Sequence, residues 1–344
     1  MGVPAIVTAG DTRAAKTIYG ESKVFLEVGG RSMVASTVAT LQRVPEVSEV
    51  WVVGNRRRLE DVFADPELSK QLSKPLFIVE QGRNLLENAW ETYRCILSRD
   101  PEAGRDPLGD EVDRSVLYLS GDLPFATPQE ISAFVRQSQA LEDCDYAAGL
   151  VPEASLVDFK PTEPGQPGIE VAYFNLREGR LRQSNLHYAA PARLGNRWRI
   201  EDMYEHRHQR EFWHMAVLAW KLFFSGAAGP LIVSLYGVMH LAGLLDRWKW
   251  HRLADWMRGL VSIEFNERAI SGILDTRFRF VITEAGGCAI DVDTEQEYDA
   301  VQAGFAGWSE KQQQRTEAVY GPLPLVSGSA NASATADSDG AGGD

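Results

Sequence analysis

The feature that most constrains this chain is a predicted buried strand that ends at an acid. Residues 116–119 form an apolar run, and the run is followed at once by Gly121 and Asp122. Pro124 then marks a turn, and an amphipathic helix is predicted to begin near Thr127. In open α/β sheets, ligands bind at the carboxyl ends of the strands. The pattern therefore predicts an α/β sheet that presents the carboxylate of Asp122 to a metal ion.

Strands and helices alternate through the first 150 residues. Such alternation predicts a mostly parallel, Rossmann-like sheet with helices on both faces. The predicted strands are 5–9, 50–54, 76–79 and 116–119, and the predicted helices are 32–43, 58–63, 85–97 and 131–141.

The pattern changes in the second half of the chain. A strand at 146–151 and a hairpin of 171–176 with 181–187 precede a Trp-rich helical insert at 200–275, before the last strand at 278–282. A final helix is predicted through Val301, with Asp293 as its cap. We therefore expect one domain at 1–303 that includes the insert, a C-terminal extension at 304–324, and a disordered tail at 325–344.

Composition limits the classes of function. The chain has 344 residues, 44% of them hydrophobic, and a formal net charge of −13. This charge disfavours nucleic acid as a partner. The three cysteines have no CxxC or zinc spacing, and the amino terminus carries no evident signal peptide, so we expect a cytoplasmic protein.

The insert has its own composition. Residues 222–245 contain no charged side chain and are interrupted at Gly229-Pro230, which favours two packed helices. An aromatic and basic flank follows them, and it supports a second interpretation, peripheral contact through 213–262 with the inner face of a membrane. The flank consists of Trp248, Lys249, Trp250, Arg252 and Trp256.

Two further segments carry candidate site residues. Gly10, after the first strand, lets the backbone approach a ligand, and Arg13 and Lys23 can neutralise phosphate charge, although the loop alone equally suits a solvated turn. In an extended segment Asp291 and Asp293 face the same side. With Asp293 used as a helix cap, Asp122 and Asp291 form a reasonable carboxylate pair for Mg²⁺.

Together these segments resemble the NTP transferases of the molybdenum-cofactor guanylyltransferase-like family, which have a glycosyltransferase-A-like fold. Ala9-Gly10-Asp11, Arg13 and Lys23 match the opening motif, with Asp11 in place of its second glycine. Gly121-Asp122-Leu123-Pro124 matches the Gly-Asp-x-Pro metal motif, and Asp291-Val292-Asp293-Thr294 matches the closing motif. The resemblance covers about 1–150 and 278–303.

The resemblance implies that an acceptor phosphate or hydroxyl attacks the α-phosphate of an NTP and releases pyrophosphate. It implies Mg²⁺ on Asp122 and Asp291, with Arg13 and Lys23 as catalytic cations. The implied nucleotide-binding residues are Ala9, Gly10, Asp11, Thr12 and Gly121, with Gly82 and Asn84 near the base. A plain helix start is the other interpretation of the 81–84 segment.

The acceptor is less constrained. Asn185 in the hairpin, with Arg207 and Arg210 in the insert, suits a small-molecule or lipid-like acceptor, but the basic cluster also suits a solvated helix face. Two alternatives remain open: a metal-dependent glycosyltransferase that uses a nucleotide sugar, and a non-catalytic, membrane-associated nucleotide-binding protein.

Overall fold

The structure is a computed structural model of the chain. It describes residues 2–11, 17–161, 166–197 and 261–323, together with residues 241, 245, 248–250, 253 and 259. Most of the expected helical insert and the expected disordered tail from 324 onward lie outside these residues. Within the described residues, no helix combines the length and apolar character needed to cross a membrane.

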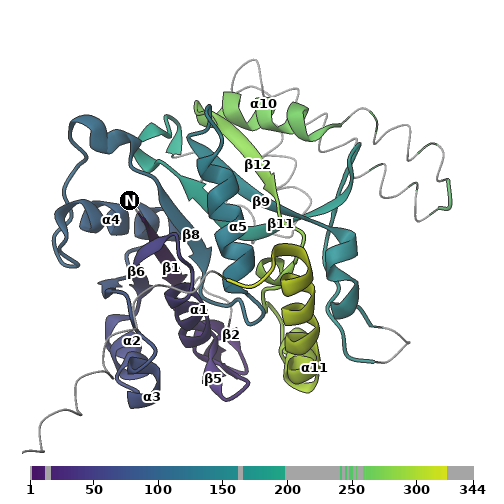
Figure 1. Ribbon diagram of the computed structural model, residues 1–344, viewed down its shortest axis with the longest axis horizontal. Helices are drawn as coiled ribbons and strands as arrows, with labels where there is room; N and C mark the ends of the chain where they lie inside the picture. The colour runs from purple at the N-terminus through teal and green to yellow at the C-terminus, as the bar shows by residue number, and fades with distance from the viewer. Residues whose placement is uncertain are drawn as a thin grey trace, which may run out of the picture.

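One eight-stranded sheet forms the centre of the molecule, in the order β12-β9-β11-β8-β1-β6-β7 with β10 beside β11 (Figure 1). Neighbouring strands run parallel except around β11, which is antiparallel to both β8 and β9. The mostly parallel α/β sheet is therefore confirmed. The strands are β1 (Val3–Ala9), β6 (Val47–Gly54), β7 (Leu76–Glu80), β8 (Val116–Ser120), β9 (Tyr146–Pro152), β10 (Phe174–Leu176), β11 (Gly179–Ala189) and β12 (Phe278–Ile282).

The side chains of β1 point alternately to the two faces of the sheet, which explains why helices cover both faces. Ala5 and Val7 point into one apolar cluster, which includes residues of α1, α2 and α5. Ile6 points into another cluster, with Trp51 and with Tyr93 of α4. Because successive strand residues face opposite sides, each face buries its own helical layer. The helices are α1 (Met33–Gln42), α2 (Arg56–Phe63), α3 (Pro66–Ser69), α4 (Leu85–Ser98), α5 (Pro128–Gln139), α10 (Ile263–Leu274) and α11 (Glu295–Tyr320).

Short elements connect these layers at both edges of the sheet. Two small antiparallel pairs are formed by β2 (Thr17–Ile18) with β3 (Glu21–Ser22), and by β4 (Glu27–Val28) with β5 (Arg31–Ser32). The 3-10 helices are η1 (Lys23–Phe25), η2 (Gly109–Asp113), η3 (Glu153–Phe159), η4 (Pro191–Arg193) and η5 (Gly287–Ala289).

The last helix differs from the sequence prediction. It begins after Thr294, whose hydroxyl accepts from the Glu297 amide in a capping box, so the prediction of Asp293 as the cap is wrong. It also continues to Tyr320, so the boundary drawn at residue 304 lies inside a helix. Phe305 and Trp308 pack against Phe125, which explains why the helix continues past Val301.

Candidate active site

Asp122 lies just beyond β8 and is fully buried. The Gly121 amide donates to the Thr8 carbonyl oxygen at 2.9 Å, and a Cβ at Gly121 would lie 3.1 Å from that oxygen. The hydroxyl of Ser120 donates to the Asp122 carboxylate. The strand and its tight exit therefore fix the carboxylate at the sheet edge, as the sequence predicts.

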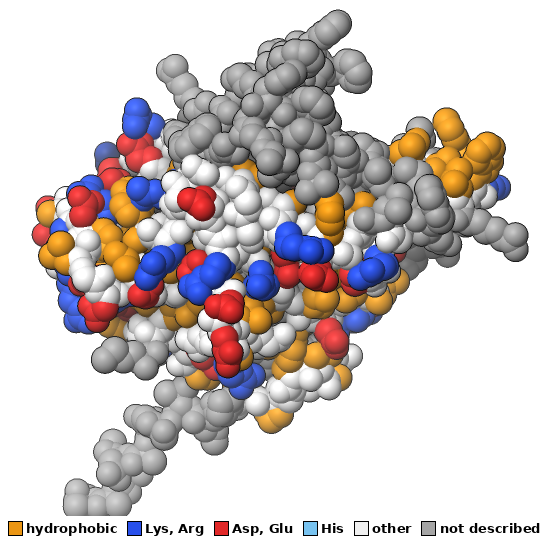
Figure 2. All heavy atoms as spheres, turned by 90° about the horizontal axis from the view of Figure 1, so that it is seen from above, with side chains coloured by type: hydrophobic (Ala, Val, Ile, Leu, Met, Phe, Trp, Pro, Cys, Tyr) orange, Lys and Arg blue, Asp and Glu red, His pale blue; other side chains and the backbone are white. Residues whose placement is uncertain are grey.

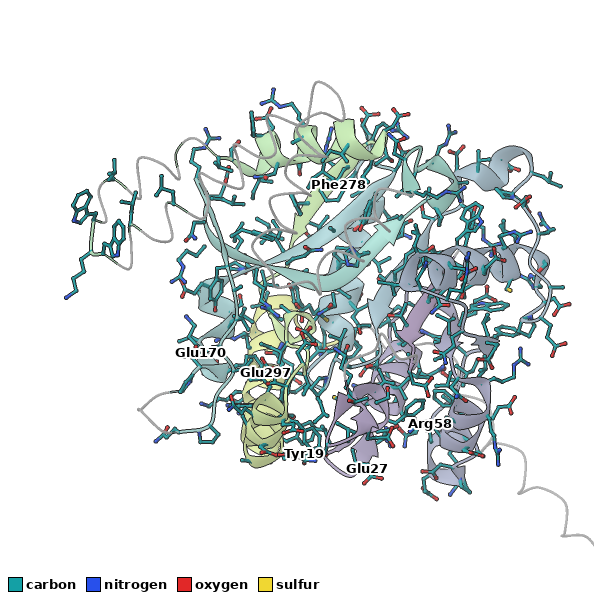
Figure 3. The ribbon with its side chains drawn as sticks, turned by 180° about the vertical axis from the view of Figure 1, so that it is seen from behind. Tyr19, Glu27, Arg58, Glu170, Phe278 and Glu297 are labelled. Carbon is teal, nitrogen blue, oxygen red and sulfur yellow. The ribbon has the colours of Figure 1, made fainter. Side chains whose placement is uncertain are left out.

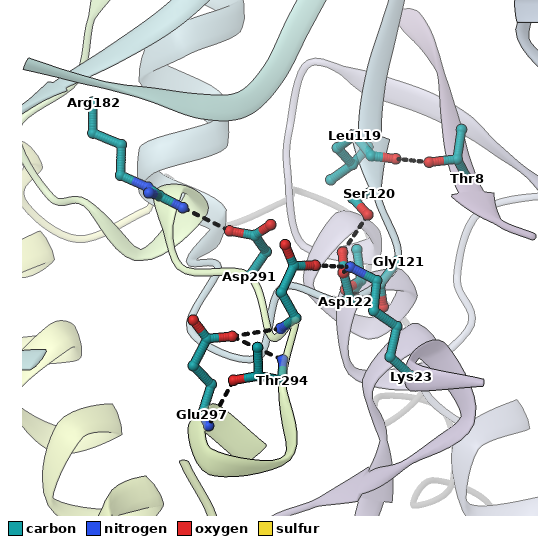
Figure 4. Close-up of polar contacts among 12 residues, drawn as sticks. Thr8, Lys23, Leu119, Ser120, Gly121, Asp122, Arg182, Asp291, Thr294 and Glu297 are labelled. Atoms are coloured by element: carbon teal, nitrogen blue, oxygen red, sulfur yellow. Dashed lines mark hydrogen bonds and ion pairs between the residues drawn. The ribbon is translucent and has the colours of Figure 1, made fainter. Parts of the chain in front are cut away.

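Asp291 and Asp293 come from the segment that follows β12 and η5. Each of these acids and Asp122 offers one oxygen, and the three oxygens all lie within 4.8 Å of one another (Figure 4). The expectation that Asp291 and Asp293 face the same side is met. The backbone amide of Asp293 donates to Glu297 at 2.8 Å, which leaves the side chain to join the cluster rather than cap the helix.

Lys23, the first residue of η1, contacts two of these acids. Its ammonium pairs with Asp122 and donates to Asp293 at 2.7 Å. Burial alone would lower the pKa of Lys23, but the nearby charges of Asp122 and Asp293 outweigh burial and raise it above its ordinary value. Lys23 is therefore held as a fixed positive charge at the acids.

Arg182 of β11 is a site residue that sequence reasoning missed. Its guanidinium donates to Asp291 and to the Ala289 carbonyl oxygen, each at 2.8 Å. Burial, followed by the charges of Asp122 and Asp293, raises the pKa of Asp291, and Arg182 opposes this. We call Asp122, Asp291 and Asp293, with Lys23 and Arg182, the carboxylate cluster; it holds one more acid than cations.

A second group of charges surrounds Asp11, at the end of β1. The Asp11 amide donates to Gln81 Oε1 at 2.9 Å, and Gln81 Nε2 donates back to the Asp11 carboxylate at 2.5 Å. Arg58 donates to Asp11 at 3.3 Å and to Glu21 at 2.7 Å, and its guanidinium lies over the Phe25 ring. We call Asp11, Glu21, Arg58 and Gln81 the Asp11 cluster. In it the carboxylate that replaces a family glycine is paired within the protein.

Both clusters lie at the same end of the molecule. Figure 3 shows Arg58 of the Asp11 cluster near this end, together with Glu297, which contacts Asp293, whereas Phe278, the first residue of β12, lies near the other end. The parallel strands thus bring together residues from distant parts of the chain at their carboxyl ends. Ala9 and Gly10 lie at this edge too, and a Cβ at Gly10 would lie 3.5 Å from Gln81 Oε1.

The segment after β7 forms the start of a helix. Gly82 donates its amide to Asn88 at 2.5 Å, and Asn84 caps α4 by accepting from the Glu87 amide at 2.8 Å. The structure thus shows the helix start that the sequence offered as one interpretation, and a role of Gly82 and Asn84 in nucleotide binding stays a prediction.

The acceptor prediction is partly outside the described residues. Asn185 lies on β11, and its side chain makes no hydrogen bond to the described residues, whereas Arg182 on the same strand reaches Asp291. Arg207 and Arg210 lie outside the described residues, as do Thr12 and Arg13.

Comparison with known proteins finds a match in the first part of the chain. A family model described as a MobA-like NTP transferase domain matches residues 5–155, which include Lys23 and Asp122. Residues 5–155 are therefore similar to the domains of that family. The resemblance inferred from the motifs is thereby confirmed, and Asp291, Asp293 and Arg182 lie beyond the matched region.

The chain is also similar to curated and solved proteins. It is 29% identical over 119 residues to 2-C-methyl-D-erythritol 4-phosphate cytidylyltransferase of Chlorobium luteolum, which covers 35% of this chain and 47% of that protein. The enzyme of the same name from Pelodictyon phaeoclathratiforme is 29% identical over 128 residues, covering 36% and 49%. The chain thus spans about half the length of these relatives.

A solved structure supports the fold over most of the chain. A hypothetical transferase from Thermus thermophilus aligns with a TM-score of 0.56 at 20% identity, covering 86% of this chain and 99% of that one. The glycosyltransferase-A-like fold expected from the sequence is therefore confirmed.

Proposed function

We propose that this protein is a nucleotidyltransferase that transfers NMP from an NTP to an acceptor and releases pyrophosphate. The observation that carries the proposal is the convergence of Lys23, Asp122 and Asp291, from three distant segments, at the carboxyl edge of the sheet. The domain family matched by residues 5–155 supports the same reaction class.

The carboxylate cluster suits Mg²⁺. Oxygen ligands are what this ion prefers, and its sites in phosphoryl transfer usually combine one or two carboxylates with substrate phosphates. Asp122 and Asp291 would hold the ion, and Asp293 is close enough to serve as a third ligand. A bound Mg²⁺ would neutralise developing charge on the phosphates. Because the carboxylate cluster holds one more acid than cations, its net negative charge favours the binding of a cation.

The residues of the chain would act by position and charge. An acceptor oxygen forms a bond to the α-phosphorus while the bond from that phosphorus to the bridging oxygen breaks, and pyrophosphate leaves with the electron pair. Such transfer depends mainly on positioning and electrostatic stabilisation. We assign Lys23, and by family resemblance Arg13, to the leaving pyrophosphate. Gly10 would let the backbone approach the nucleotide closely, and Gly121 lets the chain leave β8 close against β1.

CTP is the first donor to test, because the two curated relatives are named as cytidylyltransferases. Their names also specify a phosphorylated acceptor, which agrees with an anionic acceptor near Arg182. We propose a small phosphate- or hydroxyl-bearing molecule as the acceptor.

Product identity tests the reaction class. The protein is incubated with Mg²⁺, each of four radiolabelled NTPs and a panel of sugar and polyol phosphates, and the products are separated. Nucleotidyl transfer predicts pyrophosphate and an NMP–acceptor product. Free nucleoside diphosphate from a nucleotide sugar would instead favour the glycosyltransferase alternative.

A contact with an anionic membrane surface is a second proposal, carried by the described part of the insert. Trp248 and Trp250 are 60% and 61% exposed and flank Lys249. Figure 2 shows a group of hydrophobic side chains projecting at one end of the molecule. Indole rings favour the membrane interface, and basic residues are attracted to anionic headgroups. The sequence at 246–258 holds four arginines and lysines and two aspartates in a chain of net charge −13.

Vesicle flotation tests this contact. We expect the protein to float with vesicles of phosphatidylglycerol and phosphatidylcholine, and the variant with both Trp248→Ala and Trp250→Ala to remain unbound. Equal flotation of the two proteins would contradict the proposal. Flotation without Mg²⁺-dependent chemistry would favour the non-catalytic alternative.

A further inference from the structure

Glu130, in the first turn of α5, is a buried acid that the proposed reaction does not use. Its side chain is fully buried, and a hydroxyl and two backbone amides donate to its carboxylate. The Thr283 hydroxyl and the Gly286 amide each donate to Oε1 at 3.0 Å, and the Cys288 amide donates to Oε2 at 3.1 Å. All three donors belong to the segment that leads from β12 to Asp291. One carboxylate therefore organises a whole loop.

The same loop is held tightly against the turn that carries Asp122. A Cβ at Gly287 would lie 2.0 Å from the Phe125 carbonyl oxygen, so only glycine fits there. Gly286 has a φ of +90° and would place a Cβ 2.8 Å from the Ser155 carbonyl oxygen. The backbone between Thr283 and Cys288 thus follows a path that other residues could not adopt without displacing their neighbours.

Glu130 therefore bridges the two segments that supply the acids. It follows Asp122 by eight positions, across the Leu123–Thr127 turn, and its bonds fix the loop that ends shortly before Asp291. Beyond the loop, Arg182 bonds the Ala289 carbonyl oxygen and continues the restraint to Asp291. A buried acid costs free energy unless donors satisfy it, and three donors from one loop do so here.

We infer that Glu130 is a positioning residue that sets the spacing between Asp122 and Asp291, and hence the affinity of the carboxylate cluster for a divalent cation. The inference rests on the proposed metal role of these acids. It goes beyond the reaction class by assigning a residue that touches neither the metal ion nor the substrate. Partners that orient metal ligands typically change metal affinity 10–100-fold when they are replaced.

Binding of Mn²⁺ alone, followed by electron paramagnetic resonance of the free ion, tests the inference without requiring turnover. Glu130→Gln keeps the shape of the side chain but replaces one acceptor oxygen with an amide that cannot accept from the loop. We expect Mn²⁺ binding to weaken about tenfold. Thr283→Val removes one donor only, and we expect a smaller weakening, about twofold to threefold.

Glu111→Gln is the matched control. Glu111 accepts from both Arg105 nitrogens and from the Leu108 amide, but it precedes the amino end of β8, away from the acids. We expect unchanged Mn²⁺ binding in this variant. Circular dichroism establishes that each variant is folded, and if Glu130→Gln does not fold, Thr283→Val decides.

The outcomes separate this inference from the proposed function. Wild-type protein that binds no Mn²⁺ would overturn the metal site itself, and with it the role of Glu130. Wild-type protein that binds Mn²⁺ no more tightly than folded Glu130→Gln or Thr283→Val would overturn the positioning role alone. A weakening shared equally by Glu111→Gln would show general destabilisation and would also overturn it.

Discussion

The carboxylate cluster and the Asp11 cluster lie at the same sheet edge but treat their acids differently. In the carboxylate cluster three acids converge within 4.8 Å of one another, and two cations bracket them. In the Asp11 cluster the same cation pairs with both acids, because Arg58 donates to Asp11 and to Glu21. The Gln81 side chain accepts from the Asp11 backbone amide and donates to the Asp11 carboxylate.

This difference in how the acids are paired indicates which cluster binds a ligand. Acids held close together repel one another, so their arrangement is stabilised by an added cation. The acids of the Asp11 cluster are instead distributed around one arginine, which connects β1, β3 and α2. We therefore interpret the first cluster as a binding site and the second as a clamp on the loop between Asp11 and Glu21.

The largest effect is expected from Asp122→Asn. Loss of the buried carboxylate should lower activity on the order of 10³-fold, since a metal ion supplies several kcal/mol of charge stabilisation. Pyrophosphate release measures this. Asp143→Asn, which changes an exposed acid paired with Arg277, is the control and should retain full activity. Full activity in Asp122→Asn would contradict the interpretation of the carboxylate cluster as the binding site.

Lys23→Met should lower activity about 10²-fold, because it removes one fixed charge near the leaving group. It also leaves the three acids with Arg182 as their remaining cation in the cluster. Without divalent ions the variant should therefore melt at a lower temperature than the wild type, and Mg²⁺ should recover more stability in the variant. Thermal unfolding with and without Mg²⁺ measures this difference. A variant whose melting temperature does not change with Mg²⁺ would contradict Mg²⁺ binding at the carboxylate cluster.

A smaller effect is expected from Asp11→Asn. Loss of this partly buried ion pair with Arg58 costs about 1 kcal/mol, so the KM for the NTP should rise about fivefold with little change in kcat. Glu102→Gln, which breaks the Arg56 pair on the same helix, is the control. A fall in kcat as large as that of Lys23→Met would mean that the Asp11 cluster takes part in the chemistry.

The smallest effect concerns acid stability outside both clusters. Burial lowers the pKa of His187 to about 4, and its Nδ1 lies 3.0 Å from the Tyr146 hydroxyl. Below pH 6.5 the unfolded chain takes up a proton that the folded chain resists, so stability falls as the pH drops towards 4. His187→Gln should lose less stability between pH 7 and 5.5, by about 1 kcal/mol.

Chemical unfolding at several pH values measures that difference. Tyr146→Phe keeps the imidazole and should follow the wild type. If His187→Gln loses stability as steeply as the wild type, the acid sensitivity belongs to other titratable groups.

Sequence reasoning predicted the sheet and much of the carboxylate cluster. The strand ending at Asp122 and the period-two spacing of Asp291 and Asp293 are local patterns, and β-strand geometry carries them directly into space. The wrong prediction of Asp293 as the helix cap also concerns a local sequence pattern. Asp293 and Thr294 are both good capping residues, and the capping box with Glu297 decides between them only once the helix start is known.

Arg182 and Arg58 could not be found in the same way. Arg182 lies in the hairpin in which the sequence favours Asn185 as a site residue, and only the insertion of β11 between β8 and β9 brings the Arg182 guanidinium to Asp291. The pairing of Asp11 with Arg58 and Gln81 joins residues 47 and 70 positions apart. These contacts follow from the order of strands in the sheet, which alternation alone does not specify.

The most direct test of the central claim is the melting temperature of wild-type protein and of Asp291→Asn with CTP, with Mg²⁺, and with both. A ligand that binds only the folded state raises the melting temperature. We predict a clear rise in the wild type only when CTP and Mg²⁺ are both present, and no such rise in Asp291→Asn. An equal rise in the two proteins would contradict the assignment of this cluster as the metal and nucleotide site.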